Sequence, residues 1–83
     1  MSKYDGLREY LRRRSTTLVR LSFDQVAKLV PGGLPTSAFR HRAWWANELG
    51  GSHVHAAAWL DAGWRVDSVD LEARWVTFKR GRP

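Results

Sequence analysis

The sequence contains no cysteine, so neither a disulfide framework nor a cysteine-bearing zinc site can hold the fold together. No run approaches the ~18 apolar residues that a membrane-spanning helix needs, and the N-terminus lacks the apolar core of a signal peptide. We therefore expect a cytoplasmic protein that does not bind membranes and is stabilised by packing alone. With 83 residues, the chain is long enough for one domain, residues 1–83.

Motifs that carry out catalysis are also missing. No serine stands in a nucleophile elbow, and Pro31-Gly32-Gly33 lacks the lysine and hydroxyl of a phosphate-binding loop. His53 and His55 form a His-x-His pair, but residues two apart on a helix point about 200° away from each other. Such a pair cannot easily share one ion. We expect no enzymatic activity, no metal and no other cofactor.

Positive charge and tryptophan, in contrast, are abundant. The formal net charge is +6, and five residues are tryptophan. Residues 1–42 hold nine Lys/Arg against three Asp/Glu, whereas residues 43–83 hold five of each. Excess charge serves solubility in many small proteins. Its concentration in one half of this chain favours a face that meets a polyanion.

Helical spacing of Tyr4, Leu7 and Leu11 predicts an amphipathic helix over residues 3–13. The arginines that end it, residues 12–14, suit two interpretations that the sequence leaves open. They compensate the negative end of the helix dipole, or they contact phosphate. The β-branched residues of 16–21 then predict a short strand.

Ser22 and Gln25 have the spacing of a capping box, which predicts a second helix that stops at Pro31-Gly32-Gly33. A helix with Phe39, Ala43 and Ala46 on one face is expected next. Cap, terminator and alternation signals predict three later elements: a helix from the N-cap Ser52 to Ala62 before Gly63, and strands over 64–69 and 74–79 around a turn at 70–73. A frayed basic tail is expected at 80–83.

This order of elements predicts an α+β fold of the winged helix-turn-helix type, with three or four helices, a small antiparallel sheet and a C-terminal β-hairpin. In that fold the first strand joins the hairpin to make a three-stranded sheet. The helix before the hairpin enters the major groove, and the turn of the hairpin is the wing. The fold is an analogy for function rather than evidence of it.

The segment from Arg40 to His55 combines cations, flat aromatic rings and an amide. Arginine binds phosphate or guanine through its fork, Asn47 has the donor and acceptor that pair with adenine, and an exposed tryptophan stacks on an unpaired base. Trp44 and Trp45 also suit core packing, but adjacent residues cannot share one helical stripe, so we expect one of them to be partly exposed. The candidate nucleic-acid-binding residues are Arg14, Arg40, His41, Arg42, Trp45, Asn47, Ser52, His53, His55, Lys79 and Arg80.

Several short words occur together along nearly the whole chain, from Tyr4 to Arg80. They are Tyr4-Asp5-Gly6-Leu7, Leu21-Ser22-Phe23, Leu34-Pro35-Thr36-Ser37-Ala38, Trp44-Trp45-Ala46-Asn47, Ala58-Trp59-Leu60-Asp61-Ala62-Gly63-Trp64-Arg65-Val66, Val69-Asp70-Leu71 and Val76-Thr77-Phe78. In these words the chain resembles a family of short, largely uncharacterised bacterial proteins and domains. The resemblance implies no activity. Members of that family commonly have glutamine where this chain has His55.

We therefore expect a module that binds nucleic acid, and double-stranded DNA in particular. It would act at the nucleoid, as a small transcriptional regulator or as the targeting domain of a defence or phage-related system. One alternative is a protein-interaction module, antitoxin-like or an adaptor subunit, with exposed tryptophan and arginine as anchors. A second is binding of single strands or RNA through aromatic stacking. A homodimer suits the predicted fold, although no heptad repeat requires one.

Overall fold

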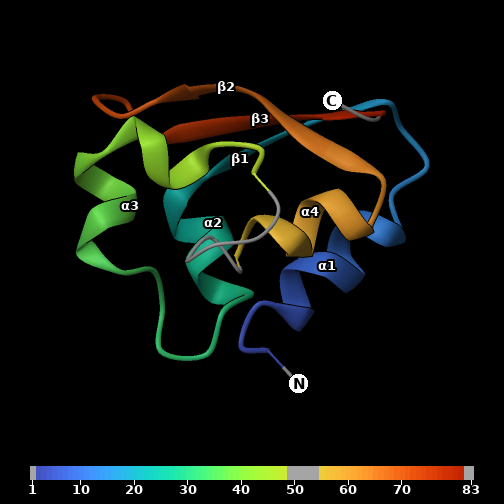
Figure 1. The fold of residues 1–83 in the computed structure, drawn as a ribbon, viewed down its shortest axis with the longest axis horizontal. Helices are drawn as coiled ribbons and strands as arrows, with labels where there is room; N and C mark the ends of the chain where they lie inside the picture. Colours follow the sequence, from blue (N-terminus) through green and yellow to red (C-terminus); the bar gives the residue numbers. More distant parts are fainter. Residues whose placement is uncertain (1, 49–54, 82–83) are drawn as a thin grey trace.

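The computed structural model describes residues 2–48 and 55–81. Helices form one layer of the molecule and a three-stranded sheet forms the other (Figure 1). Among the described residues, no helix is long and apolar enough to cross a membrane. The predicted α+β class is confirmed, and the elements follow one another in the predicted order. These elements are α1 (Asp5–Arg12), β1 (Leu18–Ser22), α2 (Phe23–Lys28), α3 (Thr36–Arg40), the 3-10 helix η1 (Arg42–Trp45), α4 (Ala56–Asp61), β2 (Trp64–Asp70) and β3 (Trp75–Arg80).

The ends of several elements lie where the sequence signals place them. Ser22 Oγ accepts a hydrogen bond from Gln25 N at 3.1 Å and Gln25 Oε1 accepts one from Ser22 N at 2.8 Å, so the predicted capping box is confirmed. Gly63 ends α4 with a φ of 86°, a left-handed conformation that glycine adopts without strain. The N-cap of α4 is His55, whereas the predicted cap, Ser52, lies outside the described residues.

The sheet has the strand order β1-β3-β2, and both pairings are antiparallel. Its inner face is apolar because side chains alternate along each strand. Val19, Phe78 and Val66 form one cross-strand row on this face, and Leu21, Val76 and Val69 form the next. The irregularity between Val66 and Ser68 gives β2 one extra residue, Asp67. In β3 the buried residues Val76 and Phe78 alternate with residues that are not buried, so the predicted alternation in the last strand is confirmed.

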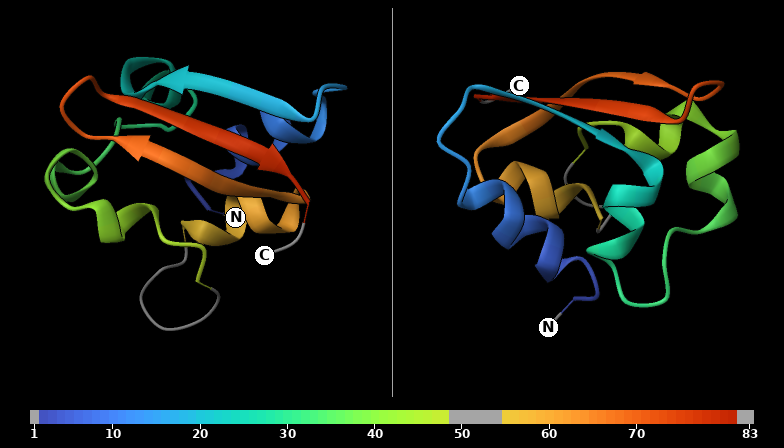
Figure 2. Two further views of the ribbon diagram at one scale, coloured as in Figure 1. Left: turned by 90° about the horizontal axis from the view of Figure 1, so that it is seen from above. Right: turned by 180° about the vertical axis from the view of Figure 1, so that it is seen from behind.

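The outer face of the sheet is open, and Figure 2 (left) shows the three strands without a helix over them. The registers place three cross-strand rows on this face: Leu18 with Lys79 and Arg65, Arg20 with Thr77 and Ser68, and Ser22 with Trp75 and Asp70. We call this surface the open face. It includes Leu18, a large apolar residue that is 55% exposed.

Aromatic rings fill the space between the helices and the sheet. The largest fully buried side chains are Trp45, Trp59, Trp64, Phe23 and Phe78. Trp45 stacks on Phe23 with ring centroids 5.0 Å apart, and Trp59 contacts Phe78 at 5.7 Å. Because each such ring removes about 150–250 Å² from water, a few of them build a core without disulfides.

The helix predicted around Phe39, Ala43 and Ala46 is broken in the structure. α3 ends at Arg40, and His41 has an extended backbone with φ −125° and ψ 114°. A single 3-10 turn, η1, then carries the chain through Trp45. The break turns both indoles into the core, with the rings of Trp44 and Trp45 in edge contact at 4.7 Å. Local periodicity could not reveal this change of direction, because ring contacts with Tyr4, Phe23 and Trp59 determine it.

Gly6 lies where α1 passes closest to the end of α2. A Cβ at this position would lie 2.5 Å from the carbonyl oxygen of Leu29, which belongs to the backbone and cannot rotate away. We expect Gly6→Ala to lower the free energy of unfolding by about 1–3 kcal/mol, as other overpacking substitutions do. Urea denaturation followed by tryptophan fluorescence measures the difference. Were the variant more stable, by the roughly 1 kcal/mol that alanine adds in an exposed helix, the close approach would not exist.

Tyr4 anchors the start of α1 in the core and is 8% exposed. Burial raises the pKa of its hydroxyl, because the phenolate would lose its hydration. In the unfolded chain the hydroxyl ionises near pH 10, whereas in the folded chain it stays neutral to higher pH. The free energy of unfolding should therefore fall as the pH rises above about 10. Tyr4→Phe should show a shallower fall between pH 9 and pH 11 in urea denaturation, and equal slopes would contradict the burial effect.

Candidate functional site

The predicted nucleic-acid-binding arginines and lysine separate into two groups at opposite ends of the sheet. Arg14, Lys79 and Arg80 lie where α1 ends and β3 ends, whereas the segment from Arg40 to Arg42 lies beside the turn between β2 and β3 (Figure 1). The Arg80 guanidinium joins the first group by donating to the carbonyl oxygens of Arg14 and Thr16. The fold therefore does not bring these predicted cations together on one continuous face.

The first group is part of a larger cluster of cations, which we call the basic end. Arg65 belongs to it because it is the cross-strand neighbour of Lys79. Its members are Arg12, Arg13, Arg14, Arg65, Lys79 and Arg80. The cluster contains residues from both halves of the chain. The positive charge of the folded protein is therefore not concentrated where residues 1–42 lie, although those residues hold the excess positive charge of the sequence.

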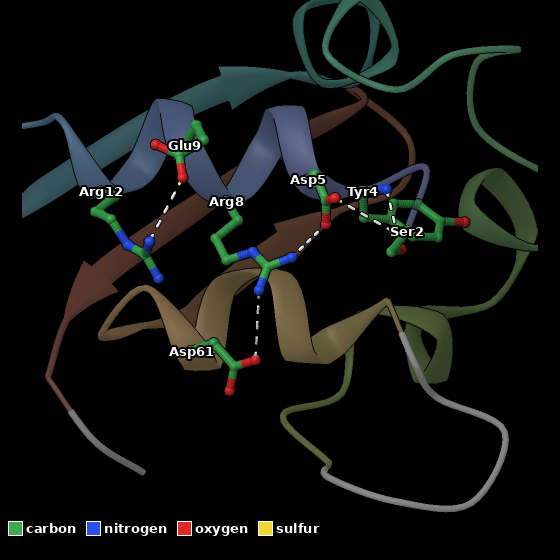
Figure 3. A network of polar contacts seen from close by, with 7 residues as sticks. All are labelled: Ser2, Tyr4, Asp5, Arg8, Glu9, Arg12 and Asp61. Carbon is green, nitrogen blue, oxygen red and sulfur yellow. Dashed lines mark hydrogen bonds and ion pairs between the residues drawn. The ribbon is translucent and has the colours of Figure 1, made fainter.

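Most cations of the basic end have no carboxylate partner. Arg12 pairs with Glu9 at 3.4 Å, and one turn earlier Arg8 lies between Asp5 and Asp61, 3.9 Å from the latter (Figure 3). Within residues 2–48 and 55–81, no ion pair joins any of the other five members of the basic end to an acidic side chain. Their positive charge is therefore available to a ligand.

Two of these arginines are also held in place by aromatic rings. The Arg80 guanidinium lies 4.6 Å from the ring centre of Trp64, and that of Arg14 lies 5.3 Å from the ring centre of Tyr10. Arg80 belongs to β3, with its N–H donating to Thr17 O at 2.8 Å, so the predicted frayed tail does not begin at residue 80. Cations that are already ordered lose less conformational entropy when they bind an anion.

The opposite end of the sheet carries charges of both signs. Arg40 and His41 are exposed there, and Arg74 lies over the ring of Phe39 at 5.3 Å. The guanidinium of Arg42 donates to the carbonyl oxygen of Val69 and thereby covers the outer edge of β2. The hairpin adds three exposed carboxylates at Asp67, Asp70 and Glu72. Because positive and negative side chains are mixed at this end, it has no excess of positive charge to attract a polyanion.

The tryptophan pair does not present a stacking surface. Trp44 is 8% exposed and Trp45 is 2% exposed, so the prediction that one of them is partly exposed is wrong. The indole N–H of Trp45 donates a hydrogen bond to Ala38 O at 2.9 Å, so the polar group of this side chain is already hydrogen-bonded within the protein. In the described conformation a base cannot reach either ring.

Asn47, predicted to pair with adenine, is used inside the protein instead. Its Oδ1 accepts hydrogen bonds from Trp59 Nε1 at 2.9 Å and from Val66 N at 2.8 Å, and its Nδ2 donates to Val66 O at 2.9 Å. The amide thus joins the segment after η1 to α4 and to the edge of β2. We call these three bonds the Asn47 network.

His55 is 7% exposed, and its ring is stacked on Trp44 with the centroids 3.9 Å apart and the planes 2° from parallel. Its Nε2 lies 2.6 Å from the carbonyl oxygen of Trp44. This histidine is therefore a core residue rather than a base-contacting one in the described structure. The other two predicted contacts in this segment, Ser52 and His53, lie outside the described residues.

The open face contains a group that the sequence-based prediction missed. Arg20 and Trp75, on adjacent strands, form a cation–π pair in which the guanidinium is 4.7 Å from the ring centre. Trp75 is not among the residues selected from the sequence, although the period of two places it on the opposite face from Val76 and Phe78. That alternation was the signal for an exposed ring, but only the strand order shows that Arg20 is its neighbour.

A family model described as a domain of unknown function (DUF7662) matches residues 4–81. The chain belongs to the DUF7662 family. This match confirms the expectation that the chain belongs to an uncharacterised family. No curated protein and no solved structure matches the chain. The description of DUF7662 assigns no chemistry to the family.

Proposed function

We propose that this domain binds nucleic acid through the basic end. The proposal rests on five cations that gather at one end of the fold and have no carboxylate partner among the described residues: Arg13, Arg14, Arg65, Lys79 and Arg80. Cations placed against phosphates release the counterions condensed on the nucleic acid, and this release drives binding without regard to sequence. Arg14 and Arg80, already fixed over aromatic rings, would act as pre-ordered phosphate contacts.

The winged-helix mode of binding has less support than nucleic-acid binding itself. The strand order β1-β3-β2 is the one that this mode requires. However, α4 occupies the place of the recognition helix, and its described residues bury Ala56, Ala58 and Trp59. Its charged residue, Asp61, is an anion and would repel phosphate. We therefore assign the main contact to the basic end, and a regulatory or targeting role would be one use of that contact.

The alternative of a protein-interaction module required exposed tryptophan anchors near residue 45. The burial of Trp44 and Trp45 removes those anchors. Among the described residues Leu18 is the one large apolar side chain that is exposed, and with the partly exposed Trp75 on the same face it makes a small patch for a stable interface. Nucleic acid is thus the better-supported partner.

Fluorescence anisotropy with labelled oligonucleotides tests the proposal. The protein should bind both random duplex DNA and single strands at ~50 mM salt, and its affinity should fall steeply as the salt concentration rises. If all five cations contact phosphates, the slope of log K against log salt should lie between about −3.5 for a single strand and about −4.5 for a duplex. No binding to duplex DNA, single-stranded DNA or RNA at low salt would refute the proposal.

A further inference from the structure

The open face holds the chain's single partly exposed indole. Four of the five tryptophans are buried, and Trp75 is half-buried on the outer side of β3. The Arg20 guanidinium lies over this ring, 4.7 Å from its centre. Both the planar guanidinium and the indole can stack on nucleobases.

A shallow hollow of about 380 Å³ opens around this pair. It is lined by Arg20, Ser68, Val69, Asp70, Trp75 and Thr77. The lining therefore combines a flat aromatic wall with two hydroxyls, a carboxylate and a cation. Such a mixture suits a flat heterocycle with polar edges better than an apolar side chain.

The carboxylate narrows the choice of ligand further. Asp70 is exposed, and its Oδ1 accepts one hydrogen bond, from Ala73 N at 2.9 Å. A carboxylate repels phosphate but accepts hydrogen bonds from the exocyclic amino groups of cytosine, adenine and guanine. The hollow is thus electrostatically suited to the base of a nucleotide and not to its phosphate.

The phosphates have cations within reach on the same face. Lys79 is four residues along β3 from Trp75, which corresponds to about 13 Å, and Arg65 is its cross-strand neighbour. A nucleic-acid strand with one base at Trp75 can therefore run along β3 toward the basic end, a distance of about two nucleotides. The open face and the basic end form one continuous path because Lys79 belongs to both.

We propose that the Trp75 hollow binds an unpaired base carrying an amino group, so that this domain prefers single-stranded over duplex nucleic acid. The inference rests on the proposed function, since the basic end supplies the phosphate contacts. Bases inside a duplex are stacked and paired, and they cannot enter the hollow. A duplex would meet the basic end alone.

Anisotropy titrations with oligo-dC, oligo-dT and a mixed-sequence duplex of equal length test this inference. We expect oligo-dC to bind about 10-fold more tightly than the duplex, and more tightly than oligo-dT, which offers Asp70 no amino group. Trp75→Leu should lower the affinity for oligo-dC about 10-fold without changing the affinity for the duplex. Trp75→Phe, which keeps an aromatic ring, should lose less.

A second variant keeps the test independent of any loss of folding in Trp75→Leu. Asp70→Asn retains an oxygen that can accept from Ala73 N, and it should reduce the preference for oligo-dC over oligo-dT. Circular dichroism of each variant checks the fold. Equal binding of duplex and single strands that is unaffected by Trp75→Leu and Asp70→Asn would overturn the base site and leave the basic end in place. Absence of binding to all three probes and to RNA would instead refute the proposed function.

Discussion

The double variant Arg13→Glu/Lys79→Glu should bind nucleic acid about 100-fold more weakly than the parent at ~50 mM salt. Each lost phosphate contact costs about a factor of 10 under these conditions, and the new carboxylates add repulsion. Both side chains are exposed and have no ion pair in the described part of the structure, so the fold should be unaffected. Anisotropy titrations measure the affinity, and the slope against salt should become shallower by about two.

The matched control is Lys28→Glu/Arg40→Glu, which changes the net charge by the same amount away from the basic end. Both of these residues are exposed as well. We expect a loss of only a few-fold, from the weaker overall field of the protein. Equal losses in the two double variants would mean that net charge alone attracts nucleic acid, and the basic end would then not be the site. A larger loss in the control would return the site to Arg40, where the sequence-based prediction put it.

Asn47→Ala should lower the free energy of unfolding by about 3 kcal/mol, because it removes all three bonds of the Asn47 network. The indole N–H of Trp59 would then be buried without an acceptor, and the backbone of Val66 would lose both of its partners at the edge of β2. A loss of this size is a large fraction of the roughly 5–15 kcal/mol that stabilises a typical domain. Urea denaturation followed by tryptophan fluorescence and circular dichroism gives the value.

Asn47→Asp is the informative comparison. The carboxylate keeps an oxygen that can accept from Trp59 Nε1 and Val66 N, but it cannot donate to Val66 O. We expect it to be less destabilising than Asn47→Ala. If both variants unfold at the parent's urea concentration, Asn47 does not hold the edge of β2, and its amide would again be a candidate for base contact.

Much of the fold could be predicted because its signals are local. The capping box at Ser22 and Gln25, the terminator Gly63 and the alternation around Val76 each depend on neighbours only a few residues away. The path between Arg40 and Asn47 could not be predicted in this way. Its direction depends on tertiary contacts such as the stacking of Trp45 on Phe23. Where tertiary packing determines the backbone, periodicity of the sequence is no guide.

The candidate site could be predicted only in part for a related reason. Arg14, Lys79 and Arg80 were selected for their charge, but their proximity arises from the pairing of β1 with β3, which joins residues as far apart as Leu18 and Lys79. Asn47 was selected for its side-chain chemistry, and the same donor and acceptor groups proved suited to an internal network. A residue type states what a side chain can bind, whereas the fold decides whether the partner is a ligand or the protein itself.

The place of β3 between the other two strands has a consequence for biosynthesis. β1 and β2 both hydrogen-bond to β3, which comes last along the chain, so neither has its partner until residues 75–80 have been made. Until then, the aromatic side chains of the helices lack the sheet that covers them in the folded protein. A nascent chain halted before β3 would expose the surface that Phe78 and Val76 cover. Folding of this domain should therefore be a late, nearly all-or-none event that follows synthesis of its final strand.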